Sequence, residues 1–209
     1  MENFDRKKYW ETIYQTKKLK EVSWFQPTPE TSLAFFKQYK VPTTAKVIDI
    51  GGGDSLLVDY LLDLGYQDIT VLDISETAIN RAKQRLGDRA KKVKWIVANA
   101  VTFEPVGKYD FWHDRAAFHF LTQEHEIINY IDTVQKSIKP TGIFVIGTFS
   151  EQGPNTCSGL EINRYSEKTM TEKMKLYFEK INCITVDHKT PFDTHQSFIF
   201  CSFRKLLSV

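Results

Sequence analysis

Short apolar runs alternate along the chain with longer stretches in which apolar residues recur every three or four positions. The runs are brief and rich in β-branched or aromatic residues, which is typical of strands buried inside a sheet. Because strands and helices alternate, the pattern predicts a parallel sheet covered by helices on both faces. Five strands are predicted in this part of the chain, at residues 46–50, 69–73, 93–98, 109–113 and 143–148.

The stretches between these strands have the spacing and the end signals of helices. Residues 56–64 place apolar side chains at i, i+3 and i+4, and Gly65 follows as a common helix-ending residue. Ser75 suits the N-cap of a second helix, which is predicted to run to Leu86. A third helix is predicted at residues 124–138, ended by Pro140.

The last part of the chain has a different pattern. After a predicted helix at residues 166–178, two extended runs follow at 181–188 and 196–204. The loop between the two runs is too short for a parallel crossover, so they must pair as an antiparallel hairpin. We therefore expect an α/β fold with a seven-stranded, mostly parallel sheet, a C-terminal antiparallel hairpin and helices on both faces.

The composition narrows the class of protein. With 209 residues, 42% of them hydrophobic and 26% charged, the chain suits one soluble globular domain. A formal net charge of +2 creates no global field for nucleic acid or an anionic membrane. The most apolar stretch, 142–149, is too short to span a bilayer as a helix, and the N-terminus is charged where a signal peptide needs an apolar segment. We therefore expect a cytoplasmic protein.

The cysteines give no sign of a structural framework. Cys157, Cys183 and Cys201 are odd in number, widely spaced and without any CxxC pair. This pattern predicts neither a disulfide framework nor a zinc site.

A glycine-rich turn follows the first predicted strand. Glycines let the backbone turn tightly and let a ligand approach without a Cβ in the way. A dinucleotide-binding turn would need Gly or Ala three residues after Gly53, where this chain has Leu56. An acidic residue just before the glycines instead suits a cationic or zwitterionic ligand. The turn reads Asp49-Ile-Gly51-Gly52-Gly53-Asp54-Ser55.

Two further strand ends carry polar residues. Asp73 ends the second strand about 20 residues after the glycines, where a carboxylate can accept both hydroxyls of a ribose. Folds that bind NAD share this feature, so Asp73 indicates an adenosine ligand without choosing the cofactor. Asn99 and Ala100 follow the third strand, where a side-chain amide beside a backbone N–H can read an adenine edge. All three strand ends are expected to meet in one crevice.

Taken in order, these segments resemble motifs I to IV of the class I (Rossmann-like) methyltransferases that depend on S-adenosylmethionine (SAM). The resemblance covers about residues 45–150, and the C-terminal hairpin extends it. It implies SAM as cofactor, S-adenosylhomocysteine (SAH) as product and no metal. Many family members have Asp where Asn99 stands, but Asn can still accept a hydrogen bond from the adenine amino group. By the resemblance, Gly51 and Gly53 would pass under the methionine part of SAM, and Asp49 would face that part. Asp73 would hold the ribose, and Asn99 with Ala100 the adenine. Gly52, Ser55 and Ile74 are further cofactor-binding candidates.

The resemblance also implies how one domain, residues 1–209, is organised. Residues 1–44 would form a helical cap or lid, 45–150 the SAM-binding core, and 151–209 a lid loop, a helix and the hairpin. Trp10 or Trp24 in the cap would cover the sulfonium, with cation–π attraction as the physical reason. Aromatic packing onto the sheet is the alternative for these side chains.

The densest group of functional side chains is Trp112-His113-Asp114-Arg115, at the end of the fourth strand. His113 is the best candidate for a general base, because the ordinary pKa of histidine is near neutrality. The alternative is a histidine that only shapes the pocket. Asp114 is a second catalytic candidate that could receive the ammonium of the cofactor, or it could simply pair with Arg115.

The substrate candidates lie at Arg115 and in the long loop after the fifth strand. That loop contains Cys157, Arg164 and Tyr165, and its length indicates a lid or a binding loop. Arg164 could clamp a carboxylate or a phosphate, or form an ion pair within the protein. The Trp-His-Asp-Arg, Cys-Ser-Gly-Leu and Arg-Tyr elements resemble a bacterial methyltransferase subgroup, which does not fix a substrate.

The favoured function is methyl transfer from SAM to a small molecule by in-line displacement, for which the protein supplies proximity, alignment and a base where one is needed. The lack of a basic face argues against a nucleic-acid substrate, and we expect a monomer or homodimer. Two alternatives stay open: a protein lysine or N-terminal methyltransferase, and a SAM-binding module without catalysis. A nicotinamide-dependent oxidoreductase is the least favoured, because of Leu56 and the hairpin.

Overall fold

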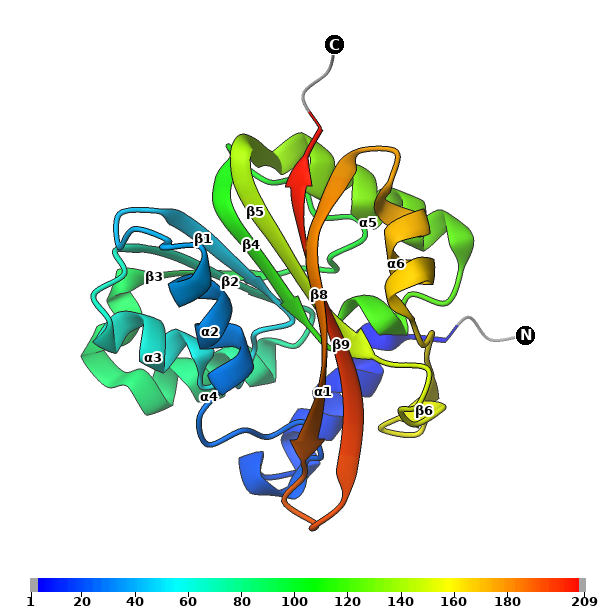
Figure 1. The fold of residues 1–209 in the computed structure, drawn as a ribbon. Coiled ribbons are helices and arrows are strands. Elements are labelled where there is room, and N and C mark those ends of the chain that lie inside the picture. Colours follow the sequence, from blue (N-terminus) through cyan, green and yellow to red (C-terminus); the bar gives the residue numbers. More distant parts are fainter. Residues whose placement is uncertain (1–3, 207–209) are drawn as a thin grey trace.

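The main sheet has seven strands, described with residues 4–206 in a computed structural model (Figure 1). The strands are β1 Lys46–Ile50, β2 Asp68–Asp73, β3 Val93–Val97, β4 Tyr109–Arg115, β5 Ile138–Phe149, β8 Phe178–Lys189 and β9 His195–Lys205. Their order is β3-β2-β1-β4-β5-β9-β8. The first five strands pair in parallel, while β9 is antiparallel to both β5 and β8. The predicted sheet and its antiparallel hairpin are confirmed.

Helices cover both faces of the sheet, as predicted. Apolar side chains of α2 (Glu30–Gln38), α3 (Leu57–Asp63) and α4 (Glu76–Leu86) belong to the core on one face. Those of α5 (Glu124–Ser137) and α6 (Glu167–Met174) belong to the core on the other face. The N-cap of α4 is the predicted serine, whose side chain accepts a hydrogen bond from the third residue beyond it.

Short elements connect or flank the sheet. Helix α1 (Arg6–Thr16) lies below the lower ends of β4 and β5 in Figure 1. Among residues 4–206, no helix has the length and apolar composition needed to cross a bilayer. The remaining elements are η1 Leu19–Glu21, η2 Gly87–Lys92, η3 Phe118–Phe120, β6 Thr156–Cys157 and β7 Leu160–Glu161.

Two predicted helix ends differ from the structure. α5 ends before Ile138, which already pairs with Tyr109 at the start of β5. Pro140 therefore lies inside a strand rather than after a helix. The next pair is Phe111 with Ile143, so the residues around Pro140 leave the ladder, and a residue without an N–H is tolerated there. Similarly, the helix predicted to reach Phe178 ends at Met174, because Phe178 begins β8.

The absence of a disulfide, as predicted from the cysteine pattern, is wrong. Cys183 and Cys201 form a disulfide between β8 and β9, and Cys157 is the free, buried cysteine. The antiparallel register places the two bonded residues directly opposite each other, with their Cα atoms 4.1 Å apart. Cysteine spacing along a sequence carries no information on that register, so the pairing could not be seen there.

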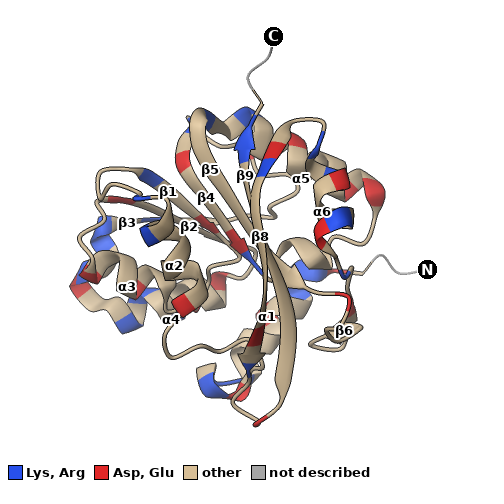
Figure 2. Ribbon diagram, in the orientation of Figure 1, with Lys and Arg blue, Asp and Glu red and all other residues tan. Residues whose placement is uncertain are grey.

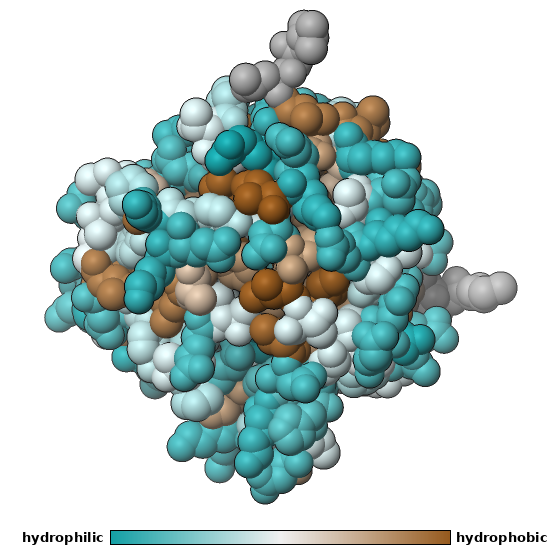
Figure 3. Space-filling view, viewed as in Figure 1, coloured by the Kyte–Doolittle hydropathy of each residue, from teal (hydrophilic) through white to brown (hydrophobic). Residues whose placement is uncertain are grey.

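The visible surface carries charges of both signs. Figure 2 shows Lys and Arg interspersed with Asp and Glu over the helices that flank the sheet. In Figure 3, a patch of apolar surface lies over the middle of β8, the edge strand, between hydrophilic neighbours. No face in this view is uniformly basic.

Candidate active site

A cavity opens at the carboxyl ends of four neighbouring parallel strands. It is lined by Asp49 of β1, Asp73 of β2, Asn99 after β3, and His113 and Arg115 of β4. These are polar residues that the sequence singled out from separate motifs, and the sheet brings them to one place. An open α/β sheet binds its ligand at this kind of position.

The glycine turn after β1 leaves space that side chains would fill. Gly51 adopts a positive φ of 66°, and a Cβ there would lie 2.8 Å from the Cβ of Ala117. A Cβ on Gly52 would overlap the carboxylate of Asp49, and a Cβ on Gly53 would overlap the carboxylate of Asp73. The turn therefore exposes two carboxylates to the cavity only because it has no side chains of its own.

Asp73 is almost completely buried beside this turn, with 4% of its surface exposed. Its Oδ1 accepts a hydrogen bond of 2.8 Å from the backbone N–H of Ser75. Burial raises the pKa of Asp73 to about 7; the hydrogen bonds from the backbone N–H groups of Ser75 and Gly53 oppose the rise, and the negative charges of Asp49 and Glu11 add to it. A group that donates hydrogen bonds to this carboxylate, such as a sugar hydroxyl, would favour its charged form.

Asn99 lines the cavity together with Ile74, Ala98 and Ala100. The Asn99 Oδ1 accepts a hydrogen bond of 3.0 Å from the backbone N–H of Val101, so the side chain closes a local turn. That bond holds the amide group at the rim of the sheet beside Asp73, whose backbone oxygen accepts from the Ala98 N–H.

His113 is held from both sides and is 2% exposed. Its Nδ1 lies 2.7 Å from Asp49 Oδ1, and its Nε2 lies 2.9 Å from Ser32 Oγ. A carboxylate can only accept, so Nδ1 carries a proton and donates it to Asp49. In the neutral imidazole Nε2 then accepts from the Ser32 hydroxyl. Ser32 comes from α2 and also lines the cavity; sequence reasoning missed it.

Asp114 does not line the cavity. It is fully buried, and its Oδ1 accepts hydrogen bonds of 3.1 Å from the N–H groups of Ala117 and Phe118. Its Oδ2 accepts a hydrogen bond of 2.6 Å from the Tyr130 hydroxyl. Burial raises the pKa of Asp114 to about 6, although these three hydrogen bonds oppose the rise. The residue holds the turn after β4, next to Ala116 with its positive φ of 64°.

Arg115 ends β4 and lines the cavity. Its Nη1 donates to the backbone oxygen of Trp24 at 3.1 Å, and its guanidinium lies 5.1 Å from the ring centre of Phe198. The pairing with Asp114 considered from the sequence does not form, since the hydrogen bonds of that carboxylate go to the turn and to Tyr130. Cys157 lines the same cavity, and burial raises the pKa of its thiol to about 11.

The other two substrate candidates lie away from the cavity lining. Arg164 is exposed and donates to the backbone oxygens of Glu151 at 2.7 Å and Gly153 at 3.2 Å. Tyr165 is buried, with its ring centre 5.6 Å from that of Phe118. Both residues therefore hold the loop after β5 rather than face a ligand in this structure.

Helix α1 covers the cavity and is fastened to the core by side chains. Trp10 and Tyr14 line the cavity, as does Trp24 in the following segment. The Glu11 carboxylate accepts hydrogen bonds from the N–H groups of Glu76 at 2.6 Å and Thr77 at 3.1 Å, so it caps the first turn of α4 from outside. The partners are 65 residues apart in the chain, and no local pattern announces the contact.

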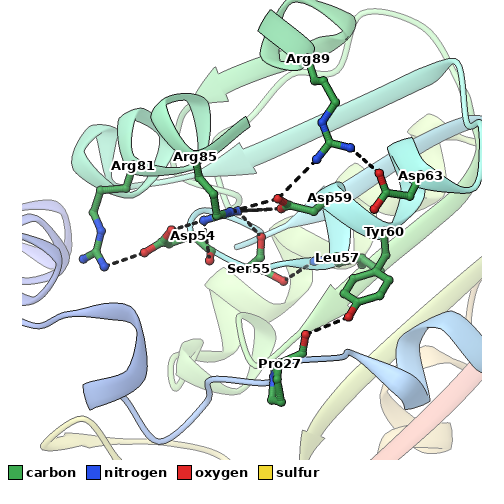
Figure 4. A network of polar contacts seen from close by, with 10 residues as sticks. All are labelled: Pro27, Asp54, Ser55, Leu57, Asp59, Tyr60, Asp63, Arg81, Arg85 and Arg89. Atoms are coloured by element: carbon green, nitrogen blue, oxygen red, sulfur yellow. Dashed lines mark hydrogen bonds and ion pairs between the residues drawn. The ribbon is translucent and has the colours of Figure 1, made fainter. Parts of the chain in front are cut away.

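A buried acidic residue ties the glycine turn to α4 (Figure 4). Asp54 is 4% exposed and forms an ion pair of 2.8 Å with Arg81 and a second one with Arg85. Arg85 also pairs with Asp59 of α3 at 2.9 Å. Burial raises the pKa of Asp54 even though both arginines lower it. Sequence reasoning missed this network, whose members come from three separate elements.

A family model described as a methyltransferase domain matches residues 48–144. Residues 48–144 are a methyltransferase domain. The domain runs from β1 into β5 and contains Asp49, Asp73, Asn99 and His113. The resemblance to class I SAM-dependent methyltransferases is thus confirmed for this part of the chain.

Similar proteins agree with this identification. The eEF1A lysine and N-terminal methyltransferase of Mus musculus is 31% identical over 121 residues, which are 57% of this chain and 17% of that protein. The chain therefore spans only a small share of this relative's length.

Solved methyltransferase structures share the fold over nearly the whole chain. The N-methyltransferase NodS of Bradyrhizobium japonicum, in complex with SAH, has a TM-score of 0.76 and 16% identity, covering 97% of this chain and 100% of that chain. The 1,6-didemethyltoxoflavin-N1-methyltransferase of Burkholderia thailandensis, bound to SAH and 1,6-didemethyltoxoflavin, has a TM-score of 0.73 and 16% identity, covering 96% and 87%. At these identities the likeness establishes the fold, which is that of the class I methyltransferases.

Proposed function

We propose that the chain transfers a methyl group from SAM to a small-molecule acceptor. One observation carries the proposal: a single cavity joins the strand ends at Asp73 and Asn99 to His113 and to Arg115 beyond it. When bound, SAM would supply a methyl group on a sulfonium; the S–CH₃ bond breaks as the acceptor–CH₃ bond forms, SAH leaves, and the acceptor atom loses its proton.

The residues that line the cavity at the ends of β1, β2 and β3 fit this cofactor. Gly51, Gly52 and Gly53 form a cradle that any Cβ would fill, and the methionine part would pass over them beside Ser55. Asp49 would face the cationic end of the ligand, since it lines the same space. The ribose would bind at Asp73 and the adenine at Asn99 and Ala100, as expected from the family resemblance, and Ile74, which lines the cavity, would be a further contact.

His113 is the group best placed to take up a proton. Asp49 accepts a hydrogen bond from the Nδ1–H group of His113. Because the proton of the neutral ring is then on Nδ1, Nε2 has a free lone pair, and the Ser32 Oγ lies 2.9 Å from it. We propose that Ser32 relays the proton of the acceptor, since His113 itself is nearly enclosed: the Ser32 Oγ takes the acceptor's proton as the Ser32 hydroxyl gives its own proton to His113 Nε2. Asp114 would act as a positioning residue, because its carboxylate fixes the turn that follows β4.

The N-terminal segment would serve as the lid of this site. Trp10 and Trp24 line the cavity, and their rings pack edge to face with the ring centres 5.8 Å apart. Their rings are therefore available to a sulfonium by cation–π attraction. The Glu11 carboxylate accepts a hydrogen bond from the first residue of α4, and this bond ties the lid to the helix that begins three residues after Asp73.

A second candidate function is methylation of a protein amine. The eEF1A relative is named as a lysine and N-terminal methyltransferase, and the aromatic lining of the cavity by Trp10, Tyr14 and Trp24 is of a kind that accepts a methylated ammonium. The alternative of a SAM-binding module without catalysis would show cofactor binding and no turnover.

One assay distinguishes these three functions. The purified chain is incubated with isotope-labelled SAM and either a metabolite library or peptides with free N-termini and lysines, and labelled products are identified by mass spectrometry. We expect labelled small molecules and unlabelled peptides. Labelled peptides alone would establish the second candidate, and SAM binding without any labelled product would establish the non-catalytic module. His113→Gln serves as the control variant, which should bind SAH but form little product.

A further inference from the structure

Arg115 is a buried cation whose hydrogen-bonding capacity is not used up. Its Nη1 donates to the Trp24 carbonyl oxygen, and the face of its guanidinium lies over Phe198. Within residues 4–206, the Nη2 atom is buried and has no hydrogen-bond partner. Asp49 lies close enough to favour the charged guanidinium, but its Oδ1 is already bound to His113. A buried donor without a hydrogen-bond partner destabilises the folded protein, and a bound ligand that accepts this hydrogen bond would remove the cost.

Two histidines near Arg115, His119 and His188, add no positive charge to its surroundings. Burial lowers the pKa of Arg115 to about 10. Burial and the charge of Arg115 together lower the pKa of His119 to about 3, and both also lower the pKa of His188. Both histidines are therefore neutral at pH 7, and neither adds charge to this end of the cavity. An anion that reaches Arg115 would meet a buried guanidinium, whose attraction is stronger away from water.

The order of the strands places Arg115 beyond the reacting centre. Asp73 ends β2 and Asn99 follows β3, both on one side of β1, whereas Arg115 ends β4 on the other side. It lies two residues after His113 and therefore on the same face of the strand. Its ring neighbour, Phe198, belongs to β9, which is still further from the proposed adenosine end.

We propose that Arg115 binds an anionic group of the methyl acceptor, a carboxylate or a phosphate, through its free Nη2. The inference rests on the proposed methyl transfer and names the acceptor class for that site. The planar guanidinium suits two oxygens of one anion, and the Trp24 carbonyl and the Phe198 ring hold it in place for this purpose. The same charge repels the protonated amine of a lysine side chain.

Binding to the SAH-saturated protein tests the proposal without a known acceptor. Calorimetric titrations use benzoate and benzamide, a neutral analogue of similar shape. We expect the wild type to bind benzoate and not benzamide, and Arg115→Met to weaken benzoate binding by about tenfold or more. Arg115→Lys should restore part of the benzoate affinity, since lysine keeps the positive charge but lacks the planar guanidinium that can bind two oxygens at once. Arg89→Met is the matched control, because Arg89 is 43% exposed and pairs with Asp63 on the surface.

The cofactor also contains a carboxylate, so SAH and 5′-methylthioadenosine, which lacks the amino-acid part, are titrated into the same variants. We expect Arg115→Met to change the SAH affinity by less than about threefold, which also shows that the variant is folded. The proposal is overturned if benzoate binds no better than benzamide or equally well to Arg115→Met. It is also overturned if the variant loses SAH but keeps 5′-methylthioadenosine, since Arg115 would then hold the cofactor's carboxylate. A wild type that binds no SAH would instead refute the proposed function.

Discussion

Asp49 Oδ1 lies 2.7 Å from His113 Nδ1, and the two residues pair directly across the parallel strands β1 and β4. The pairing joins the motif proposed to face the cofactor to the group proposed to take up a proton. Because Asp49 fixes the proton on Nδ1, it leaves the lone pair of Nε2 toward Ser32. The register of the sheet therefore decides which nitrogen of the histidine can act as a base.

Replacing His113 by Gln tests the role of this pair. We expect turnover with the identified acceptor to fall by about 100-fold or more, because general-base catalysis contributes on that scale. Ser32→Ala should lower turnover in the same direction, since it removes the hydroxyl between the cavity and Nε2. SAH affinity, measured by calorimetry, should stay the same in both variants. Full turnover by His113→Gln would leave the histidine with a purely shaping role.

Replacing Gly53 by Ala should weaken the binding of SAH. The added Cβ would overlap the carboxylate of Asp73 and meet the Cβ of Ala78 at 2.8 Å, so the carboxylate must move from its place. Gly65→Ala is the matched control, because nothing lies within 4 Å of the added Cβ there. Its positive φ of 85° should lower the melting temperature without changing the SAH affinity. Equal SAH affinity in both variants would contradict the assigned place of the ribose.

The affinity for SAH should depend on pH through Asp73. Its folded pKa of about 7 exceeds the ordinary value of 3.8, so the folded state binds more protons than the unfolded state between these pH values. The free energy of unfolding should therefore fall as the pH rises through this window. SAH binding, which favours the carboxylate, should strengthen by up to about tenfold per pH unit below 7 and level off above. Calorimetry across this range should show the slope in the wild type and its loss in Asp73→Asn.

The disulfide between Cys183 and Cys201 predicts a thiol count. Of the three cysteines, one should react with a thiol reagent after unfolding without reductant, and all three after reduction. Reduction should also lower the melting temperature, because the bond closes a segment of 18 residues and such bonds contribute about 2–4 kcal/mol. Cys157→Ser should leave no reactive thiol in the absence of reductant. Three reactive thiols in the unreduced wild type would contradict the pairing.

The sequence predicted the sheet, its hairpin and the residues at three strand ends, because each depends on a local pattern. Asp49, Asp73 and Asn99 all line the cavity, since parallel strands bring their carboxyl ends together. Contacts between distant segments could not be predicted in this way. Ser32 meets His113 across 81 positions of the chain, and only the packing of α2 against the sheet brings them together.

The catalytic and substrate candidates show the same limit. Asp114 and Arg115 are adjacent in sequence, yet one turns into the core to bind Tyr130 and the other enters the cavity. Alternation along a strand predicts opposite directions for neighbours but not which of them faces a ligand. Arg164 and Tyr165 lie in a loop without periodicity, where no pattern indicates that the arginine binds the loop's own carbonyl groups.

The central claim is that the strand ends of this methyltransferase domain bind SAM. Calorimetric titration of the purified chain with SAM, SAH and NAD tests it, with Asp73→Ala as the site variant. The control is Asp88→Ala, because Asp88 is exposed and pairs with Lys91 on the surface. We expect one molecule of SAM or SAH to bind per chain, Asp73→Ala to abolish the binding of both, and Asp88→Ala to change the binding of neither. Tight binding of NAD without any affinity for SAM or SAH would contradict the claim.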